Sequence, residues 1–288
     1  MLLYLKAILF GVVEGITEWL PISSTGHMIL LDQFVKLDVF TNATANTAYY
    51  EMFQVVIQLG AILAVVVIFW DKIWPFKKNP NPLVTGWEAH MDRDICSLWV
   101  KIIAACLPAA VIGLAFDDLF TALFYNYWCV AIALIVFGIA FIIIENRNAT
   151  LNPRVHSLKA INGKTAMIIG LFQVIAAIFP GTSRSGATIL GGLAIGVSRT
   201  VAAEFTFFLA IPVMFGASLL KIAKYIIKGA AINTTGVLVL LVGCVTAFIV
   251  SMIFIKFLMN YIKKHDFKVF GYYRIALGAL VILYALFH

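Results

Sequence analysis

A short apolar stretch occurs twice in this chain, and each copy is interrupted by a proline. The first copy spans residues 11–27 and the second spans residues 170–186, at a constant offset of 159. Each reads as an apolar helix stopped by proline, followed by a Ser/Thr/Gly cluster and a second apolar run. Lipid cannot satisfy the backbone groups of a broken helix, so such segments must line a cavity or be covered by protein. The repeat therefore marks the candidate site, and it aligns Gly11 with Gly170, Glu14 with Gln173, Pro21 with Pro180 and Ser24 with Ser183.

The composition is that of a membrane protein. The chain is 62% hydrophobic and 12% charged, with a mean hydropathy of +1.00, whereas soluble domains are about 45–50% apolar and about 25% charged. The first apolar run contains two glutamates and no small-residue cleavage site, so we do not interpret it as a removable signal peptide. The four cysteines lack metal or redox spacing and are predicted to be small membrane hydrophobes. The net charge is +7, but the basic residues lie in short loops between apolar runs, so we predict no nucleic-acid partner.

The apolar runs predict an all-α polytopic membrane protein. Two apolar regions, 3–31 and 165–193, are broken at Pro21 and Pro180 into halves too short to span, and we interpret each as a re-entrant helical hairpin. Six other runs are long enough to cross a hydrocarbon core of about 30 Å. They lie near 51–70, 99–119, 128–145, 201–222, 235–257 and 271–287.

Each half of the chain then holds one hairpin and three spans. An odd number of crossings per half inverts the second half, which gives an inverted-topology repeat with its site near the bilayer midplane. We expect one membrane domain over 1–288, with internal repeats of approximately 1–150 and 160–288. A weaker repeat signal places Glu51 and Glu204 at the start of the span that follows each hairpin.

The basic residues orient this arrangement. Fifteen Lys and Arg, Arg274 among them, are assigned to one side and five to the other, with Arg184 set aside as intramembrane. By the positive-inside rule the basic side is cytoplasmic, so both termini are expected on the outer side. The first hairpin then enters from outside and the second from the cytoplasm, and their tips are expected to meet near the middle.

The first tip carries two acids, a serine pair and a histidine. Glu14 and Glu18 are four residues apart on one helix face; they either reach water at a helix end or bind a metal or move protons. The sequence Ser23-Ser24-Thr25-Gly26 is typical of a helix N-cap, whose free N–H groups suit an anion. Ser23 is expected to be only a cap. Ser24 is expected to be a nucleophile, with His27 three residues on as its base.

The second tip contains the arginine that we interpret as the only one inside an apolar segment. Arg184 presents a fork of donors suited to phosphate or carboxylate, and it can at the same time pair with Glu14 or Glu18 to hold the tips together. Further hydroxyls come from Ser183, Ser185 and Thr188. Positive charge beside an activated hydroxyl suits phosphoryl transfer, and a site at mid-membrane implies a substrate with a lipid tail.

These motifs resemble the undecaprenyl-diphosphate phosphatase family, also called bacitracin-resistance proteins. The matching segments are 14–27, 51–60 and 180–188, and the length of the chain also fits. The resemblance implies hydrolysis of undecaprenyl diphosphate to undecaprenyl phosphate, which recycles the cell-wall carrier lipid in the bacterial plasma membrane and confers bacitracin resistance.

The resemblance also implies roles for the residues of both tips. Glu14, Glu18, Ser24, His27 and Arg184 would be catalytic, and Glu14 and Glu18 would bind a divalent cation, Mg²⁺ or Ca²⁺. A metal-activated water could replace Ser24 as nucleophile. A transporter or lipid flippase for a phosphorylated lipid is the alternative, because inverted repeats also build carriers, and a homodimer is left open. The remaining residues would hold the diphosphate: Ser23, Thr25, Gly26, Ser183, Ser185 and Thr188.

Overall fold

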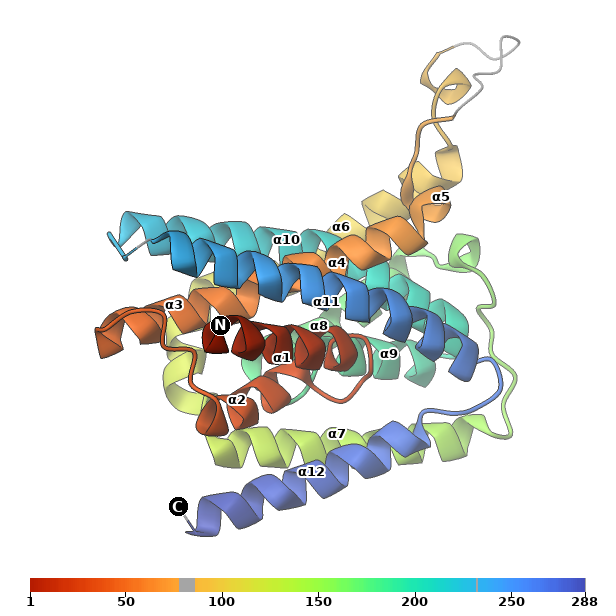
Figure 1. The fold of residues 1–288 in the computed structure, drawn as a ribbon. Coiled ribbons are helices and arrows are strands. Elements are labelled where there is room, and N and C mark those ends of the chain that lie inside the picture. The colour runs from red at the N-terminus through yellow and green to blue at the C-terminus, as the bar shows by residue number, and fades with distance from the viewer. Residues whose placement is uncertain (78–85, 232, 288) are drawn as a thin grey trace.

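The computed structural model describes residues 1–77, 86–231 and 233–287, and within these ranges every regular element is a helix (Figure 1). Two isolated β-bridges are the only strand-like pairings of these residues. The helices are α1 (Leu2–Thr17), α2 (Ser24–Phe34), α3 (Ala43–Val56), α4 (Gln58–Ile68), α5 (Trp70–Ile73), η1 (Trp87–Ala89), α6 (Arg93–Phe124), α7 (Tyr127–Asn148), η2 (Leu158–Ala160), α8 (Gly163–Ile178), α9 (Arg184–Ala194), α10 (Arg199–Ile227), α11 (Thr234–Tyr261) and α12 (Lys268–Phe287).

Six helical segments of the described chain are long and apolar enough to cross a membrane, which confirms the predicted all-α polytopic class. Four of the six predicted runs fall entirely within them, and the runs 51–70 and 99–119 extend two and three residues past the ends of theirs. The segments are Ala43–Ile68, Arg93–Phe116, Tyr127–Asn148, Arg199–Ile227, Thr234–Tyr261 and Lys268–Phe287.

The two proline-broken regions form helix pairs of matching size. Helices α1 and α8 have 16 residues each, and α2 and α9 have 11 each. At a rise of about 1.5 Å per residue, each is shorter than a hydrocarbon core of about 30 Å. Their placement as re-entrant hairpins stays a prediction.

The packing partners are the same when the two halves are exchanged. Helix α1 of the first half packs on α11 of the second, and in the same way α8 of the second half packs on α6 of the first. Two further pairs each join equivalent helices of the two halves: α7 packs on α12, and the α3–α4 segment packs on α10. Two ion pairs follow the same exchange: Glu51 pairs with Lys221 at 3.2 Å, and Glu204 pairs with Lys72 at 2.7 Å. This two-fold pattern supports the predicted inverted repeat, whose boundaries stay a prediction.

Small residues allow the broken helices to approach their partners closely. A Cβ on Gly11 would lie 2.7 Å from the carbonyl oxygen of Gly243 in α11, and a Cβ on Gly170 would collide with the backbone of Ala105 in α6. Close packing of small residues is a main source of helix association in lipid. These repeat-related glycines therefore fix the depth at which α1 and α8 lie against their neighbours.

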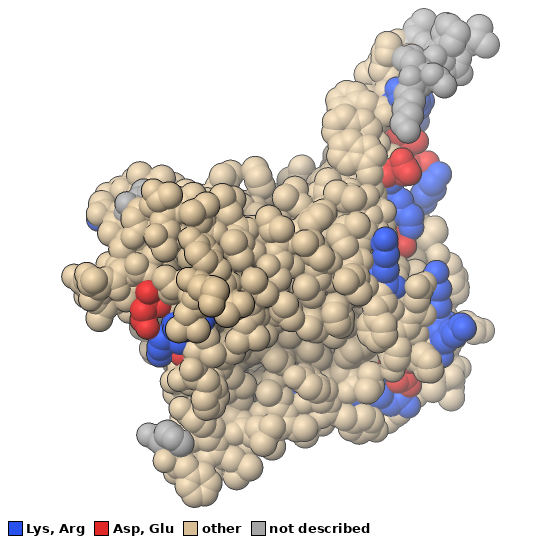
Figure 2. Space-filling model, in the orientation of Figure 1, with Lys and Arg blue, Asp and Glu red and all other residues tan. Residues whose placement is uncertain are grey.

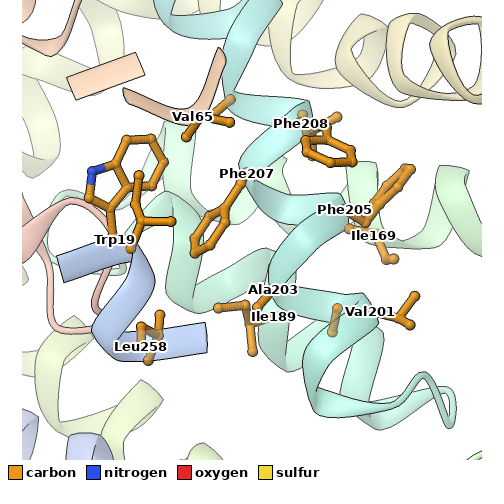
Figure 3. Close-up of a cluster of buried hydrophobic side chains, with 14 of the residues drawn as sticks. Trp19, Val65, Ile169, Ile189, Val201, Ala203, Phe205, Phe207, Phe208 and Leu258 are labelled. Carbon is orange, nitrogen blue, oxygen red and sulfur yellow. The ribbon is translucent and has the colours of Figure 1, made fainter. Parts of the chain in front are cut away.

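A cluster of buried apolar side chains includes Trp19, which lies in the turn that follows α1 (Figure 3). Trp19 is fully buried, and its ring meets that of Phe207 edge-on with centroids 5.1 Å apart. Such aromatic pairs contribute about 0.5–1.5 kcal/mol beyond their burial. Because Trp19 directly follows Glu18 in the chain, its packing fixes the backbone next to the Glu18 carboxylate.

Lys and Arg gather at one end of the molecule, where α11 ends and α12 begins, while both termini lie toward the opposite end (Figures 1 and 2). The assignment of Arg274 to this basic end is wrong, because Arg274 is fully buried within α12. Fourteen residues then remain on the basic side against five, so the predicted orientation does not change.

Candidate active site

Two serines begin the half-helices α2 and α9 in the same unusual conformation. Ser23 and Ser183 have φ values of 75° and 68°, and in the described chain they are the only non-glycine residues with positive φ. Each Oγ accepts a hydrogen bond from a glycine N–H three residues on, from Gly26 at 3.2 Å and from Gly186 at 3.1 Å. Ser23 is therefore an N-cap, as predicted. Backbone strain of about 1–3 kcal/mol at each serine is typical of functional turns.

The structure corrects the register of the repeat at these turns. The constant offset aligns Ser24 with Ser183, but the equivalent cap is Ser23, because the second turn has one more residue between its proline and its cap. Ser24 therefore corresponds to Arg184, and each is the first residue of its half-helix. A sequence offset cannot detect an insertion inside a loop whose residues are all small or polar.

The two first-turn residues converge on one carboxylate. Ser24 Oγ donates to Glu18 Oε2 at 2.5 Å, and Arg184 Nη2 donates to Glu18 Oε1 at 2.6 Å. Ser185 Oγ also donates to the Glu18 carbonyl at 3.0 Å. All of these groups are buried or nearly so; the Arg184 side chain is 14% exposed and that of Glu18 is 7%. The expected contact between the tips is thus present, with an anion held between two helix N-termini.

Glu14 lies one turn before Glu18 and is 1% exposed. Its Oε1 is buried without a hydrogen-bond partner, and a buried carboxylate oxygen of this kind is costly unless a cation or proton satisfies it. No group of three or more His, Cys, Asp or Glu gathers among the described residues. A cation here would therefore rest on two carboxylates and substrate phosphate oxygens, which is how Mg²⁺ is commonly held.

His27 lies away from Ser24, contrary to the expected hydroxyl–imidazole pair. Its Nδ1 is 2.7 Å from the Ser23 carbonyl oxygen, and its Nε2 is 2.7 Å from the Tyr273 hydroxyl. The imidazole also stacks on the Tyr273 ring, with the planes 5° apart. Glu18, and not His27, is the group in contact with the Ser24 hydroxyl.

The remaining predicted ligands divide into two groups. Thr25 and Ser183 line a cavity of about 150 Å³ together with Glu18, Ser24 and Arg184. Thr188 is fully buried and bonds the Arg184 carbonyl and the Thr206 hydroxyl, and Ser185 and Gly26 are also buried. This second group supports the turns and does not line the cavity. Gln58 and Met214 do line it, and the sequence had not singled them out.

Arg274 joins the two turns and was the main residue missed. Its guanidinium donates to the carbonyl oxygens of Pro21 at 3.1 Å, Gly181 at 3.0 Å and Thr182 at 2.7 Å. Arg184 is therefore not the only intramembrane arginine. The available signal is a lone arginine inside the predicted span 271–287, although this residue is counted with the basic side in the sequence-based assignment.

Comparisons with known proteins identify the family of this chain. A protein of Desulfitobacterium hafniense named undecaprenyl-diphosphatase is 60% identical over 97% of this chain and 95% of its own length. The undecaprenyl-diphosphatase 1 of Clostridium acetobutylicum and the undecaprenyl-diphosphatase of Enterococcus faecalis are each 56% identical, over 98% of this chain and 97% of their own lengths. The model of the family described as bacitracin resistance protein BacA matches residues 7–280. The chain belongs to the BacA family.

Proposed function

We propose that this protein is an integral membrane phosphatase that hydrolyses undecaprenyl diphosphate to undecaprenyl phosphate and inorganic phosphate. This activity recycles the cell-wall carrier lipid and confers bacitracin resistance, because bacitracin sequesters the diphosphate. The observation that carries the proposal is the convergence of Ser24 and Arg184, at two helix N-termini, on the single carboxylate of Glu18. The relatives named undecaprenyl-diphosphatase support it.

The diphosphate binds where the two half-helices begin. Free N–H groups and the partial positive charge of a helix N-terminus favour phosphate, and the guanidinium of Arg184 adds a fork of donors. Arg184 already contacts Glu18 Oε1 and Met214 Sδ through Nη2, and it donates to the Thr206 carbonyl through Nη1 at 3.3 Å, so its orientation is set before substrate arrives. When the substrate binds, its terminal phosphate accepts hydrogen bonds from Arg184 N–H groups that donate to Glu18 in the free protein.

Ser24 is the proposed nucleophile and Glu18 its base. Glu18 takes the hydroxyl proton while Oγ attacks the terminal phosphorus, and the bond to the bridging oxygen breaks to release undecaprenyl phosphate. Water then hydrolyses the phosphoserine and releases inorganic phosphate. Hydrolysis by water directly, with Ser24 only positioning the phosphate, is the competing route.

A divalent cation, Mg²⁺ or Ca²⁺, fits Glu14 and Glu18 because one buried Glu14 oxygen lacks a partner. When bound, such an ion would neutralise charge on the phosphates. His27, held between Ser23 and Tyr273, would shape the turn that carries Ser24.

The lipid tail of the substrate lies in the bilayer of a bacterial plasma membrane, and the basic end of the protein faces the cytoplasm. Both termini are then on the outer side. Assembly as a homodimer stays a prediction.

The direct test is phosphate release from C55 prenyl diphosphate by detergent-purified protein, with Mg²⁺, with Ca²⁺ and with chelator. We expect metal-dependent release that is lost in Arg184→Ala while the variant stays folded. Release that chelator does not reduce would remove the cation from the proposal.

The same assay separates the phosphatase from a lipid carrier. The two-fold packing of the helices would also suit a transporter or flippase, which needs binding groups but no hydroxyl held against a carboxylate. Well-folded wild-type protein that releases no phosphate under any metal, yet binds the lipid, would favour the carrier.

A further inference from the structure

A second cavity, of about 660 Å³, lies at the basic end of the molecule. It opens to the surface and is lined by the end of α7, the segment 151–154, the end of α9 with the loop to α10, and residues 262–263 that follow α11. Helix α9 separates it from the candidate active site, which is at the other end of this 11-residue helix, about 16 Å away at 1.5 Å per residue. The cavity is therefore distinct from the diphosphate site.

The lining of this cavity is strongly positive. Arg147, Arg154 and Lys263 line it, and none of the three has an acidic partner in the described part of the chain. The one acid in the lining is Glu145, which is already neutralised: Arg199 binds it at 2.5–3.1 Å and the Phe267 N–H at 3.1 Å. Three cations therefore face the space without a counter-charge.

Backbone donors add to this charge. Helix α10 begins in the cavity wall, and the side chain of its N-cap, Ser198, makes no capping hydrogen bond. Within the described ranges, the N–H groups of Arg199, Thr200 and Val201 have no hydrogen-bond partner. The start of a helix left open in this way favours an anion.

The cavity lies at the depth where membrane spans end. The spans of α7 and α11 end at Asn148 and Tyr261 and that of α10 begins at Arg199, at the end of the molecule where Lys and Arg gather (Figure 2). Its wall also includes apolar side chains, Leu151, Leu193 and Ile262. A pocket that is basic and partly apolar at this level matches the headgroup and first carbons of an anionic lipid.

We propose that this cavity binds the phosphate of an anionic membrane lipid headgroup. The same groups could take free phosphate, and the shared chemistry is a phosphate held by Arg147, Arg154, Lys263 and the start of α10. This inference does not depend on the proposed phosphatase activity. Basic residues at a membrane boundary commonly serve topology alone, but topology requires no cavity around them.

The probe is phosphatidylglycerol, a phosphodiester that lacks the terminal phosphate a phosphatase would remove. Bound copies are counted by native mass spectrometry of the full chain over a range of phosphatidylglycerol concentrations, with phosphatidylcholine as the neutral lipid. The test variant is Arg147→Gln/Arg154→Gln/Lys263→Gln. The matched control is Lys164→Gln/Lys256→Gln/Lys264→Gln, which removes the same charge from exposed residues at the same end but outside the cavity. Arg184→Ala reports any binding at the active site.

We expect one saturable copy on wild type that phosphatidylcholine does not replace. Its apparent affinity should fall at least tenfold in the cavity variant and less than twofold in the control and in Arg184→Ala. Inorganic phosphate at millimolar concentration should compete if the phosphate alone is recognised, and should not if the lipid chains contribute. Equal loss in the cavity and control variants, or loss in Arg184→Ala only, would overturn the proposal. If the triple variant is not monodisperse, the single variant Arg154→Gln is used as the test and Lys264→Gln as its control.

Discussion

Neighbouring serines have different tasks in the first turn. Ser23 caps α2 through its Oγ, whereas Ser24 contacts Glu18. We predict that Ser24→Ala loses nearly all turnover and little stability, because it removes the nucleophile but no cap. Ser23→Ala should instead lose about 1 kcal/mol of stability, the usual value of such a cap, and keep at least about a tenth of its turnover. Phosphate release and the melting temperature of both variants in the same detergent measure this. Substantial turnover in Ser24→Ala would favour direct attack by water.

Arg184 acts through geometry as well as charge. Its two terminal nitrogens contact Glu18, Thr206 and Met214, so the fork is held in one orientation. A lysine supplies a point charge on a flexible chain and cannot reproduce two parallel donors. We predict that Arg184→Lys lowers kcat/KM by about tenfold to a hundredfold, and that Arg184→Ala lowers it by at least about a hundredfold, as removal of a preorganised donor does elsewhere. Turnover of Arg184→Lys close to wild type would show that charge alone is sufficient.

At the scale of elements, the two turns are held together by one buried arginine from α12. Arg274 donates to carbonyl groups of both turns, and truncation would leave these acceptors unpaired inside the protein. An unsatisfied buried polar group costs about 1–3 kcal/mol. We therefore predict that Arg274→Met lowers the melting temperature and, in the protein that remains folded, lowers kcat more than it raises KM, because the turns carry Ser24 and Arg184.

The control for this change is Arg93→Met, since the Arg93 side chain is 81% exposed and its ion pair with Glu88 is long, at 3.9 Å. It should melt within a few degrees of wild type. An Arg274→Met protein with wild-type stability and kcat would show that the two turns keep their shape without the arginine.

The elements themselves could be predicted from the sequence, but the contacts at their ends could not. Apolar length identified the six spans, and Pro21 with Pro180 identified the two breaks. Hydrophobic periodicity carries no information on the number of residues within a loop. The constant offset therefore aligned Ser183 with Ser24, although the equivalent residue is Ser23. It also cannot show that an arginine near the end of an apolar run turns inward. The direction of His27 depends on Tyr273, 246 residues away in the chain, and only the tertiary structure brings them together.

At the scale of the whole molecule, charge and packing together predict an orientation in the membrane. The two ion pairs Glu51–Lys221 and Glu204–Lys72 link the two halves in opposite directions, as an inverted repeat requires. Most basic residues lie at the end that carries the second cavity, and both termini lie toward the other end (Figures 1 and 2). In the predicted orientation the first hairpin enters from the outer side and the second from the cytoplasm, so a diphosphate between their tips would be held by groups supplied from both directions.

This orientation predicts opposite labelling of two exposed positions. In a background with all four cysteines replaced by alanine, Thr41→Cys lies before α3 at the end with the termini, and Trp87→Cys lies at the basic end, where Trp87 is 52% exposed. A membrane-impermeant maleimide should label Thr41→Cys in right-side-out vesicles and Trp87→Cys in inside-out vesicles. The positive-inside rule supplies the reason, since basic loops are retained in the cytoplasm. The reversed pattern would place the second cavity on the outer face, where the lipid composition differs, and labelling of both positions in one type of vesicle would contradict an odd number of crossings between them.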